Sequence, residues 1–325
     1  IGRDLYGVTH PRLDARFFSA LDAAVRARGD AAAWTEQLFD RMRLQRVLTS
    51  SFGGRSDREE FAGRVHQRMA LAYERDFALP PKYAQHIIAR IEARYGYRLQ
   101  DLDGAIEWFN QDMAAAHAAG ARVQVKWPSH GELPETVDKD RAAAAVRKAV
   151  AGEEPAREES NALAACMFAQ RLDFARTHGQ SFQICSMSTY VTRDTYTLPL
   201  TGEAFLRSLA SWVDRTPEVV FDILNCDPVT EAFFMTMART RPNVCLCGVW
   251  WHAMSDAWIE DMVYRRLLTV PLWKLTGFFS DAYCAEWVYG KHVLMRAGIV
   301  RALARAVRNG VFNVDECPAV LQQIL

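Results

Sequence analysis

The stretch Asn243-Val-Cys-Leu-Cys-Gly-Val-Trp-Trp-His252 decides the fold class of this 325-residue chain. It begins as a short apolar run, which is typical of a buried β-strand, and it ends in aromatic and imidazole side chains. A second run, Leu275-Thr-Gly-Phe-Phe-Ser-Asp-Ala-Tyr283, has the same form and brings in Asp281. In a (β/α)8 barrel the loops that follow the strands converge on one face and carry the chemistry. The two stretches therefore predict strand ends at one active site.

Outward from these stretches, the chain alternates between short apolar runs and amphipathic segments. Further strand-like runs lie at Val47, Val123, Phe182 and Val219. Strands that alternate with helix-length crossovers predict a parallel sheet, and we predict an α/β fold of the TIM-barrel type. An open doubly wound sheet is the alternative, although no Gly-rich phosphate loop opens any of the helices.

Helical spacing of apolar residues dominates the first part of the chain. It covers 13–28, 31–43, 57–73 and 82–94, and it returns over 102–119, 138–151, 161–177, 202–216, 229–239, 287–308 and 315–325. We predict one barrel domain over 1–325, in which 1–100 is largely a helical insertion with early strands and 121–325 is the main barrel.

The composition indicates a protein with a large core and no strong electric field. Half of the residues are hydrophobic, and 39 basic residues balance 39 acidic ones. This balance gives no electrostatic case for nucleic acid or an anionic membrane surface as a partner. No apolar run approaches the roughly 20 residues that a membrane span needs. The seven cysteines lie mostly in apolar segments, which favours reduced thiols in a cytoplasmic protein over a disulfide framework.

At the strand ends the sequence resembles the uronate isomerase branch of the amidohydrolase superfamily. In that family one strand ends in Leu-Asn followed by an acidic residue, the next in Gly-x-Trp-Trp, and the last in a metal-binding Asp. Here the corresponding segments are Leu224-Asn225-Cys-Asp227, Gly248-Val-Trp250-Trp251 and Ser280-Asp281. The resemblance implies an amidohydrolase-like (β/α)8 barrel with an additional helical N-terminal region.

Weaker matches extend this resemblance upstream. Ser129-His130-Gly131 is similar to the family's Asp-His-Gly, and Phe182-Gln183-Ile184 to its Gln-Leu-His strand. Ser50-Ser51 lies where the family usually has paired aspartates after an early strand. The resemblance leads us to expect that the first barrel strand lies before Ile1 and that the family continues beyond Leu325.

Metal binding is the point at which the chain departs from the family. The family holds a divalent metal through a His-x-His pair on the first strand, a His at the end of the fifth and the Asp of the eighth. This chain contains no His-x-His, and Cys185 stands at the fifth-strand position. The resemblance implies a divalent metal, with zinc in first place and Asp281 and Cys185 as ligands. A buried core thiol is the alternative for Cys185, and a chain without metal is also open.

Three residues are candidates for acid–base chemistry. Asp281 follows a strand, where a carboxylate can carry a proton or bind a metal, and the alternative is a cap of the following helix. His130 and His252 follow strands in loops, and imidazole titrates near neutral pH. A structural role is the alternative for each histidine.

Five residues are candidates for binding the substrate. Trp250 and Trp251 could stack on a sugar face, but neighbouring strand residues point to opposite sides, so at most one faces the barrel mouth. Lys126 could hold a substrate carboxylate, and Arg193 lies where family members carry substrate-binding polar residues. Asn225 could bind sugar hydroxyls or belong to a turn.

The resemblance implies a metal-dependent aldose–ketose isomerase of carbohydrate metabolism that converts D-glucuronate or D-galacturonate to the ketouronate. One alternative is a metal-dependent hydrolase or decarboxylase of the same superfamily, because one scaffold supports several chemistries. Another is a metal-free barrel with a binding or structural role. The expected partner is a small sugar acid, and assembly into a homo-oligomer is compatible with the sequence.

Overall fold

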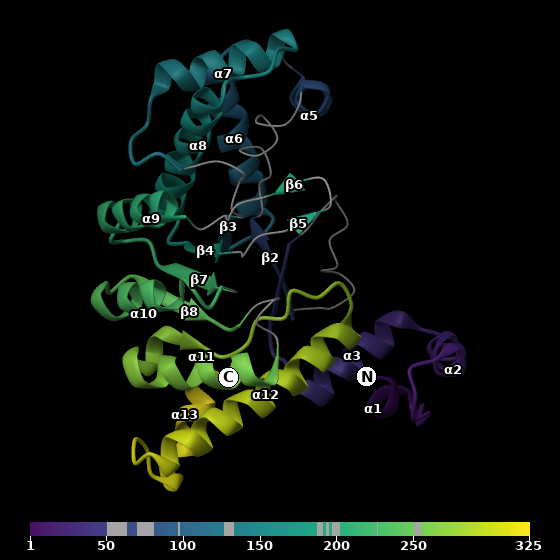
Figure 1. The fold of residues 1–325 in the computed structure, drawn as a ribbon. Coiled ribbons are helices and arrows are strands. Elements are labelled where there is room, and N and C mark those ends of the chain that lie inside the picture. The colour runs from purple at the N-terminus through teal and green to yellow at the C-terminus, as the bar shows by residue number, and fades with distance from the viewer. Residues whose placement is uncertain are drawn as a thin grey trace.

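The computed structural model describes residues 1–50, 64–69, 81–96, 98–126, 133–186, 191–192, 195–196, 202–225, 227–249 and 255–325. These residues form a parallel sheet of seven strands in the order β1-β2-β3-β4-β7-β8-β9 (Figure 1). The strands are β1 (Val47–Ser50), β2 (Val65–Met69), β3 (Val123–Lys126), β4 (Ser181–Ser186), β7 (Phe221–Asn225), β8 (Val244–Cys247) and β9 (Leu275–Thr276). A separate antiparallel pair consists of β5 (Val191–Thr192) and β6 (Thr195–Tyr196).

Helices connect the strands and continue beyond the last of them. They are α1 (Gly2–Tyr6), α2 (Ala15–Arg26), α3 (Ala31–Met42), α5 (Pro81–Tyr95), α6 (Leu102–Ala118), α7 (Lys139–Ala151), α8 (Arg157–Thr177), α9 (Glu203–Arg215), α10 (Glu231–Thr240), α11 (Asp256–Thr269), α12 (Ala285–Arg308) and α13 (Cys317–Ile324). Short 3-10 turns are η2 (Leu272–Lys274) and η3 (Val314–Glu316). In Figure 1, α9, α10 and α11 follow one another along one side of the strands.

The predicted alternation of strands and helices is confirmed, with one error and several omissions. The helix predicted over 57–73 is wrong at Val65–Met69, which is strand β2. This segment pairs in parallel with β1 and β3, so its place in the sheet overrides the helix-like spacing. No helix is predicted for Asp256–Thr269, where α11 forms with Ser255 as its N-cap, or for Gly2–Tyr6, which is α1. No strand is predicted where β5 and β6 pair.

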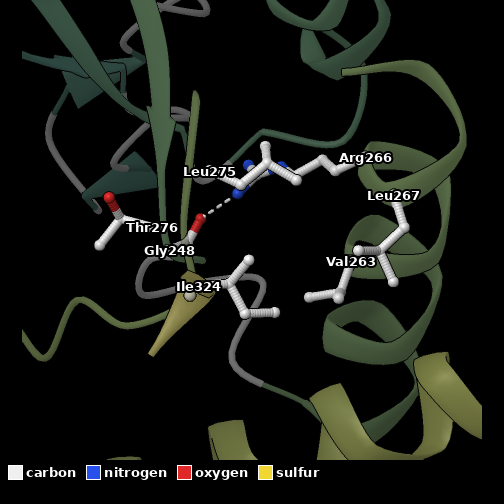
Figure 2. Close-up of a pocket in the computed structure, with 8 residues that line it drawn as sticks. Gly248, Val263, Arg266, Leu267, Leu275, Thr276 and Ile324 are labelled. Atoms are coloured by element: carbon white, nitrogen blue, oxygen red, sulfur yellow. Dashed lines mark hydrogen bonds between the residues drawn. The ribbon is translucent and has the colours of Figure 1, made fainter. Parts of the chain in front are cut away.

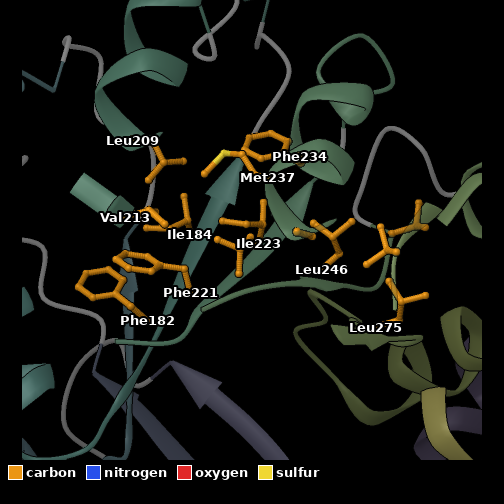
Figure 3. Close-up of a cluster of buried hydrophobic side chains, with 14 of the residues drawn as sticks. Phe182, Ile184, Leu209, Val213, Phe221, Ile223, Phe234, Met237, Leu246 and Leu275 are labelled. Carbon is orange, nitrogen blue, oxygen red and sulfur yellow. The ribbon is translucent and has the colours of Figure 1, made fainter. Parts of the chain in front are cut away.

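The main hydrophobic core lies between the sheet and the helices on its outer face. Alternate strand residues point to this face because the side-chain period of a strand is two. Figure 3 shows these side chains of β4, β7 and β8 packed against α9 and α10. The strand residues are Phe182, Ile184, Phe221, Ile223 and Leu246, and the helix residues are Leu209, Val213, Phe234 and Met237. This layer fixes the strands whose ends carry the predicted site.

The opposite face of the sheet carries a smaller apolar cluster. It consists of Val125, Cys185, Leu224 and Cys247, with Phe279 packed against it. Each of the four strand residues is at most 5% exposed. The central strands are therefore buried on both faces, which explains why they read as nearly continuous apolar runs.

The sheet is open in the described part of the chain, where β1 pairs only with β2 and β9 only with β8. Helices α1, α3 and α12 share an apolar cluster near both edges. Val47 of β1 and Phe278, which follows β9, both pack against this cluster. The two edge strands thus face a common helical layer, but a closed barrel stays a prediction.

Among the described helices, none combines the length and the apolar character that a membrane crossing requires.

Candidate functional site

The candidate site lies along the C-terminal ends of β4, β7, β8 and β9. Because these neighbouring strands run parallel, their C-terminal ends lie along one edge of the sheet. Ser186 and Asn225 are register partners at the ends of β4 and β7. Gly248 directly follows β8, and Asp281 lies a few residues after β9. The structure therefore brings the three matched strand ends to one edge, as the sequence predicts.

Asn225 is buried at the turn between β7 and α10. Its Nδ2 donates hydrogen bonds to the backbone carbonyl of Asp227, at 2.9 Å, and to Oε2 of Glu231, at 2.7 Å. Its Oδ1 accepts from the Asp227 backbone N–H and the Thr230 hydroxyl, at 3.2 and 3.3 Å. The side chain is fully buried. These contacts are those of the turn interpretation, and binding of sugar hydroxyls by Asn225 stays a prediction.

A buried ion pair connects this turn to the end of β8. Nε of Arg266 lies 2.6 Å from Oε1 of Glu231, and Nη2 lies 3.2 Å from Oε2. Nη1 of Arg266 donates to the backbone carbonyl of Gly248. Both charged side chains are 4% exposed. Such a fork-like, two-bond contact fixes orientation as well as distance.

Gly248 is required by a close approach of two strand ends. Its φ of 43° lies in the left-handed region. A Cβ at this position would lie 2.6 Å from the backbone nitrogen of Phe279 and 2.9 Å from that residue's Cβ. Only glycine meets both conditions without strain. The close approach thus explains why the first residue of the Gly-x-Trp-Trp segment is glycine in this chain.

Asp281 occupies a turn with unusual backbone geometry. Its φ is 43°, which is uncommon for a residue other than glycine but tolerated by Asp. Nζ of Lys291 donates to the backbone carbonyls of Ser280 and Asp281, the latter at 2.7 Å. Burial lowers the pKa of Lys291, and the Asp281 charge acts in the opposite direction. The predicted alternative of Asp281 as a helix cap is wrong, because Cys284 is the N-cap of α12.

The helix that follows Asp281 is tied to the N-terminal helices through Glu286. Oε1 of this carboxylate accepts from the Tyr6 hydroxyl at 2.6 Å and from Nε1 of Trp34 at 2.9 Å. Burial, together with the hydrogen bond and charge of Glu286, raises the pKa of Tyr6 to about 12. Burial acts to raise the pKa of Glu286 as well, but the hydrogen bonds outweigh it and lower this pKa.

The surroundings of Cys185 are those of a core thiol. The residue is fully buried in the apolar cluster of the inner face, between Val125 and Leu224 on the neighbouring strands. Cys247 belongs to the same cluster, and burial raises the pKa of Cys245 nearby on β8. A divalent metal needs several His, Cys or carboxylate ligands around one point. Within the described ranges, no group of three such residues could hold a metal ion, so the residues described do not fit a metal site.

Several predicted site residues lie outside the described residues. These are His130, Arg193, Trp250, Trp251 and His252. Lys126 ends β3 and pairs in register with Ile184, but its side chain also lies outside the described part. The roles assigned to all six stay predictions.

Sequence reasoning missed the charged residues that hold the strand ends in place. Glu231 opens α10, and its position there looks like an ordinary first-turn acid. Arg266 lies in a helix that the sequence analysis did not identify. Lys291 lies within the predicted helix over 287–308, where a lysine draws no attention. A charge within an otherwise apolar helix face was the one available signal.

A small pocket adjoins the Arg266 contact (Figure 2). It lies between the end of β8, β9, α11 and the last residues of α13. Val263, Leu267, Leu275 and Ile324 make its wall largely apolar, and Arg266 reaches Gly248 at its edge. Its volume of about 20 Å³ is enough for about one water molecule. The pocket is therefore too small for a sugar acid.

Comparison with solved structures identifies proteins of the same architecture. Glucuronate isomerase from Caulobacter crescentus matches with a TM-score of 0.79 and 18% identity, over 99% of this chain and 71% of that one. Uronate isomerase from Thermotoga maritima matches with a TM-score of 0.76 and 17% identity, over 89% of this chain and 67% of that one. The chain has a uronate isomerase-like fold. This agrees with the family resemblance of its strand-end motifs.

A third solved structure has a similar fold but a different name. A Lactobacillus casei protein with the provisional name of metal-dependent hydrolase matches with a TM-score of 0.65 and 15% identity. The match covers 99% of this chain and 79% of that one. No protein-family model and no curated protein matches the sequence. At these identities the uronate isomerase-like fold is shown, and the reaction is a separate question.

Proposed function

We propose that this chain is an aldose–ketose isomerase that acts on a hexuronate such as D-glucuronate or D-galacturonate. The observation that carries the proposal is the likeness to a glucuronate isomerase over 99% of the chain. The alignment of Asn225, Gly248 and Asp281 along one sheet edge supports it, because these positions match the family motifs. The TIM-type barrel with eight strands belongs to this proposal, since one further strand between β9 and β1 would close the sheet.

The proposed reaction moves a proton between two neighbouring carbons of the sugar acid. A base must remove the proton from the carbon next to the carbonyl and return it to the carbonyl carbon, while the hydroxyl proton of the first carbon passes to the carbonyl oxygen. Asp281 is the described residue best suited to this role, because its carboxylate lies in a half-buried turn at the sheet edge. Lys291 holds the two backbone carbonyls of that turn. The carboxylate thus sits on a backbone that is fixed before substrate arrives.

The divalent metal that the family resemblance implies does not have a ligand set among the described side chains. Cys185 packs in an apolar cluster, and among the described residues no group of three potential ligands includes Asp281. We therefore derive no step that passes through a metal. Zinc dependence stays a hypothesis to be tested by adding and removing the ion.

The experiment follows D-glucuronate and D-galacturonate by proton NMR with the purified chain. It is run after treatment with a chelator and again with added Zn²⁺ or Mn²⁺. The proposal expects the ketouronate to appear, and expects none above background from an Asp281→Ala variant that is folded by circular dichroism. Absence of conversion under every metal condition would contradict the proposal.

A metal-dependent hydrolase is the second candidate, and the Lactobacillus casei match favours it. The higher TM-scores of the two isomerases place it second. A panel of simple esters, lactones and amides under the same metal conditions separates the two. Hydrolysis without isomerisation would favour the hydrolase, and inactivity in both assays would favour a barrel with a binding role.

A further inference from the structure

We infer that Glu231 and Arg266 form a positioning unit that sets the ends of β7 and β8 relative to each other. The substrate used in the kinetic test below rests on the proposed function, but the positioning itself does not. Neither residue touches the Asp281 turn in the contacts described. They act through Asn225 and Gly248, which end the two strands.

The contacts of this unit form one continuous chain across two strand ends. Asn225 donates to Oε2 of Glu231 at 2.7 Å, Arg266 donates to both carboxylate oxygens, and Nη1 of Arg266 donates to the Gly248 carbonyl. Figure 2 shows the last of these contacts directly. Side-chain donors and acceptors from β7, α10 and α11 therefore form one chain of hydrogen bonds that ends at the backbone carbonyl after β8.

Burial distinguishes this unit from the other ion pairs of the chain that the structure describes. Both charges are 4% exposed, whereas the similar two-bond pair of Arg241 and Asp214 is 26% and 53% exposed. A buried pair is a poor means of adding stability, because removing two charges from water offsets much of their attraction. Its directional bonds do, however, favour one arrangement of the groups that they join. Fixing the strand ends is therefore the role that the geometry supports.

Gly248 links the positioning unit to the candidate site. The residue precedes the Val-Trp-Trp-His segment in sequence, and its backbone already lies against Phe279 on the way to Asp281. Arg266 holds the carbonyl on the other side of the same residue. A shift of this carbonyl would therefore also change the contact between Gly248 and Phe279 after β9.

The test uses the conservative variants Glu231→Gln and Arg266→Lys in the full chain. Glu231→Gln replaces an acceptor with a donor that faces Asn225 and Arg266, and Arg266→Lys keeps the charge but removes the fork. The matched controls are Asp214→Asn and Arg241→Lys, which alter the exposed pair of the same form at the opposite end of the sheet. All measurements are made well below the unfolding temperature of each variant.

The kinetic arm compares KM with kcat for the hexuronate. Positioning predicts that KM rises about tenfold in both variants, because small misplacements of binding groups are costly. A merely structural role would lower only the apparent kcat, in proportion to the folded fraction, and would leave KM unchanged. The control variants should keep the wild-type KM. An unchanged KM in Glu231→Gln and Arg266→Lys would overturn the inference.

The second arm does not depend on activity. Amide hydrogen exchange, followed by mass spectrometry, should speed up about tenfold in peptides that cover 225–231 and 244–249, while 181–186 in β4 keeps its protection. Uniform exchange across all three regions, or no change, would overturn the inference. If the wild type isomerises no hexuronate, the proposed function fails, and this arm alone decides on the positioning unit.

Discussion

The ends of β8 and β9 are neighbours in the sheet, yet they are held in different ways. The β8 end is fixed by a buried ion pair that reaches the Gly248 carbonyl. The β9 end is a half-buried turn at Asp281, held by one lysine through backbone carbonyls. In the first arrangement the charged groups bind each other, Asn225 and the Gly248 carbonyl. The second leaves a carboxylate side chain for chemistry, so scaffold and candidate reactive group lie side by side.

The largest effect is expected from breaking the buried pair. Arg266→Met leaves the Glu231 carboxylate buried without its cationic partner, which should lower the free energy of unfolding by about 3–5 kcal/mol. Arg241→Met breaks an exposed pair and should cost no more than about 1 kcal/mol. Urea unfolding of both variants measures the difference. Equal losses would show that burial of the Glu231–Arg266 pair has no special role.

The contact between the two strand ends is tested next at Gly248. Gly248→Ala introduces a Cβ into a left-handed residue and against Phe279, and should cost about 3 kcal/mol. Gly179→Ala is the matched control, since its φ is 59° and nothing lies within 4 Å of the added Cβ. That variant should cost about 1–2 kcal/mol from backbone strain alone. Equal losses in the free energy of unfolding of the two variants would show that the close approach to Phe279 adds no cost.

At the β9 end, a change of the reactive side chain should not lower the stability of the fold. Asp281→Gly relieves the positive φ and should raise the free energy of unfolding by about 0.5–1 kcal/mol, while isomerase activity is lost. Asp281→Asn should be neutral in stability, because Asn tolerates the same backbone region. Thermal unfolding and the activity assay are measured on the same samples. A marked loss of stability in Asp281→Asn would mean that the carboxylate is structural.

A smaller effect concerns the helix behind the β9 end. The pKa of Tyr6 is raised from 10.0 to about 12 in the folded chain by burial and by Glu286. Its contribution to stability is therefore complete below pH 10.0 and is lost as the pH rises toward 12. The stability difference between wild type and Tyr6→Phe should shrink over this window, measured by denaturant unfolding at several pH values. A constant difference would contradict the hydrogen bond to Glu286.

Much of this comparison could be predicted from the sequence, because strand ends follow from apolar runs. The alternation of strands and helices predicted the parallel sheet, and the motifs placed Asn225, Gly248 and Asp281 at its edge. The helix predicted over 57–73 was wrong at β2, since pairing with β1 and β3 depends on neighbours that local spacing does not reveal. The Glu231–Arg266 pair was equally hidden, because its members lie 35 residues apart on two helices.

The role of Asp281 at the sheet edge is tested most directly by the rate of hexuronate isomerisation by wild type and Asp281→Asn at matched folded concentration. We expect that the wild type converts the aldose to the ketouronate and that the variant loses about 100-fold or more in kcat/KM. Arg241→Lys, at the far end of the sheet, should retain the wild-type rate. Equal rates for Asp281→Asn and wild type would contradict the assignment of the sheet edge as the isomerase site.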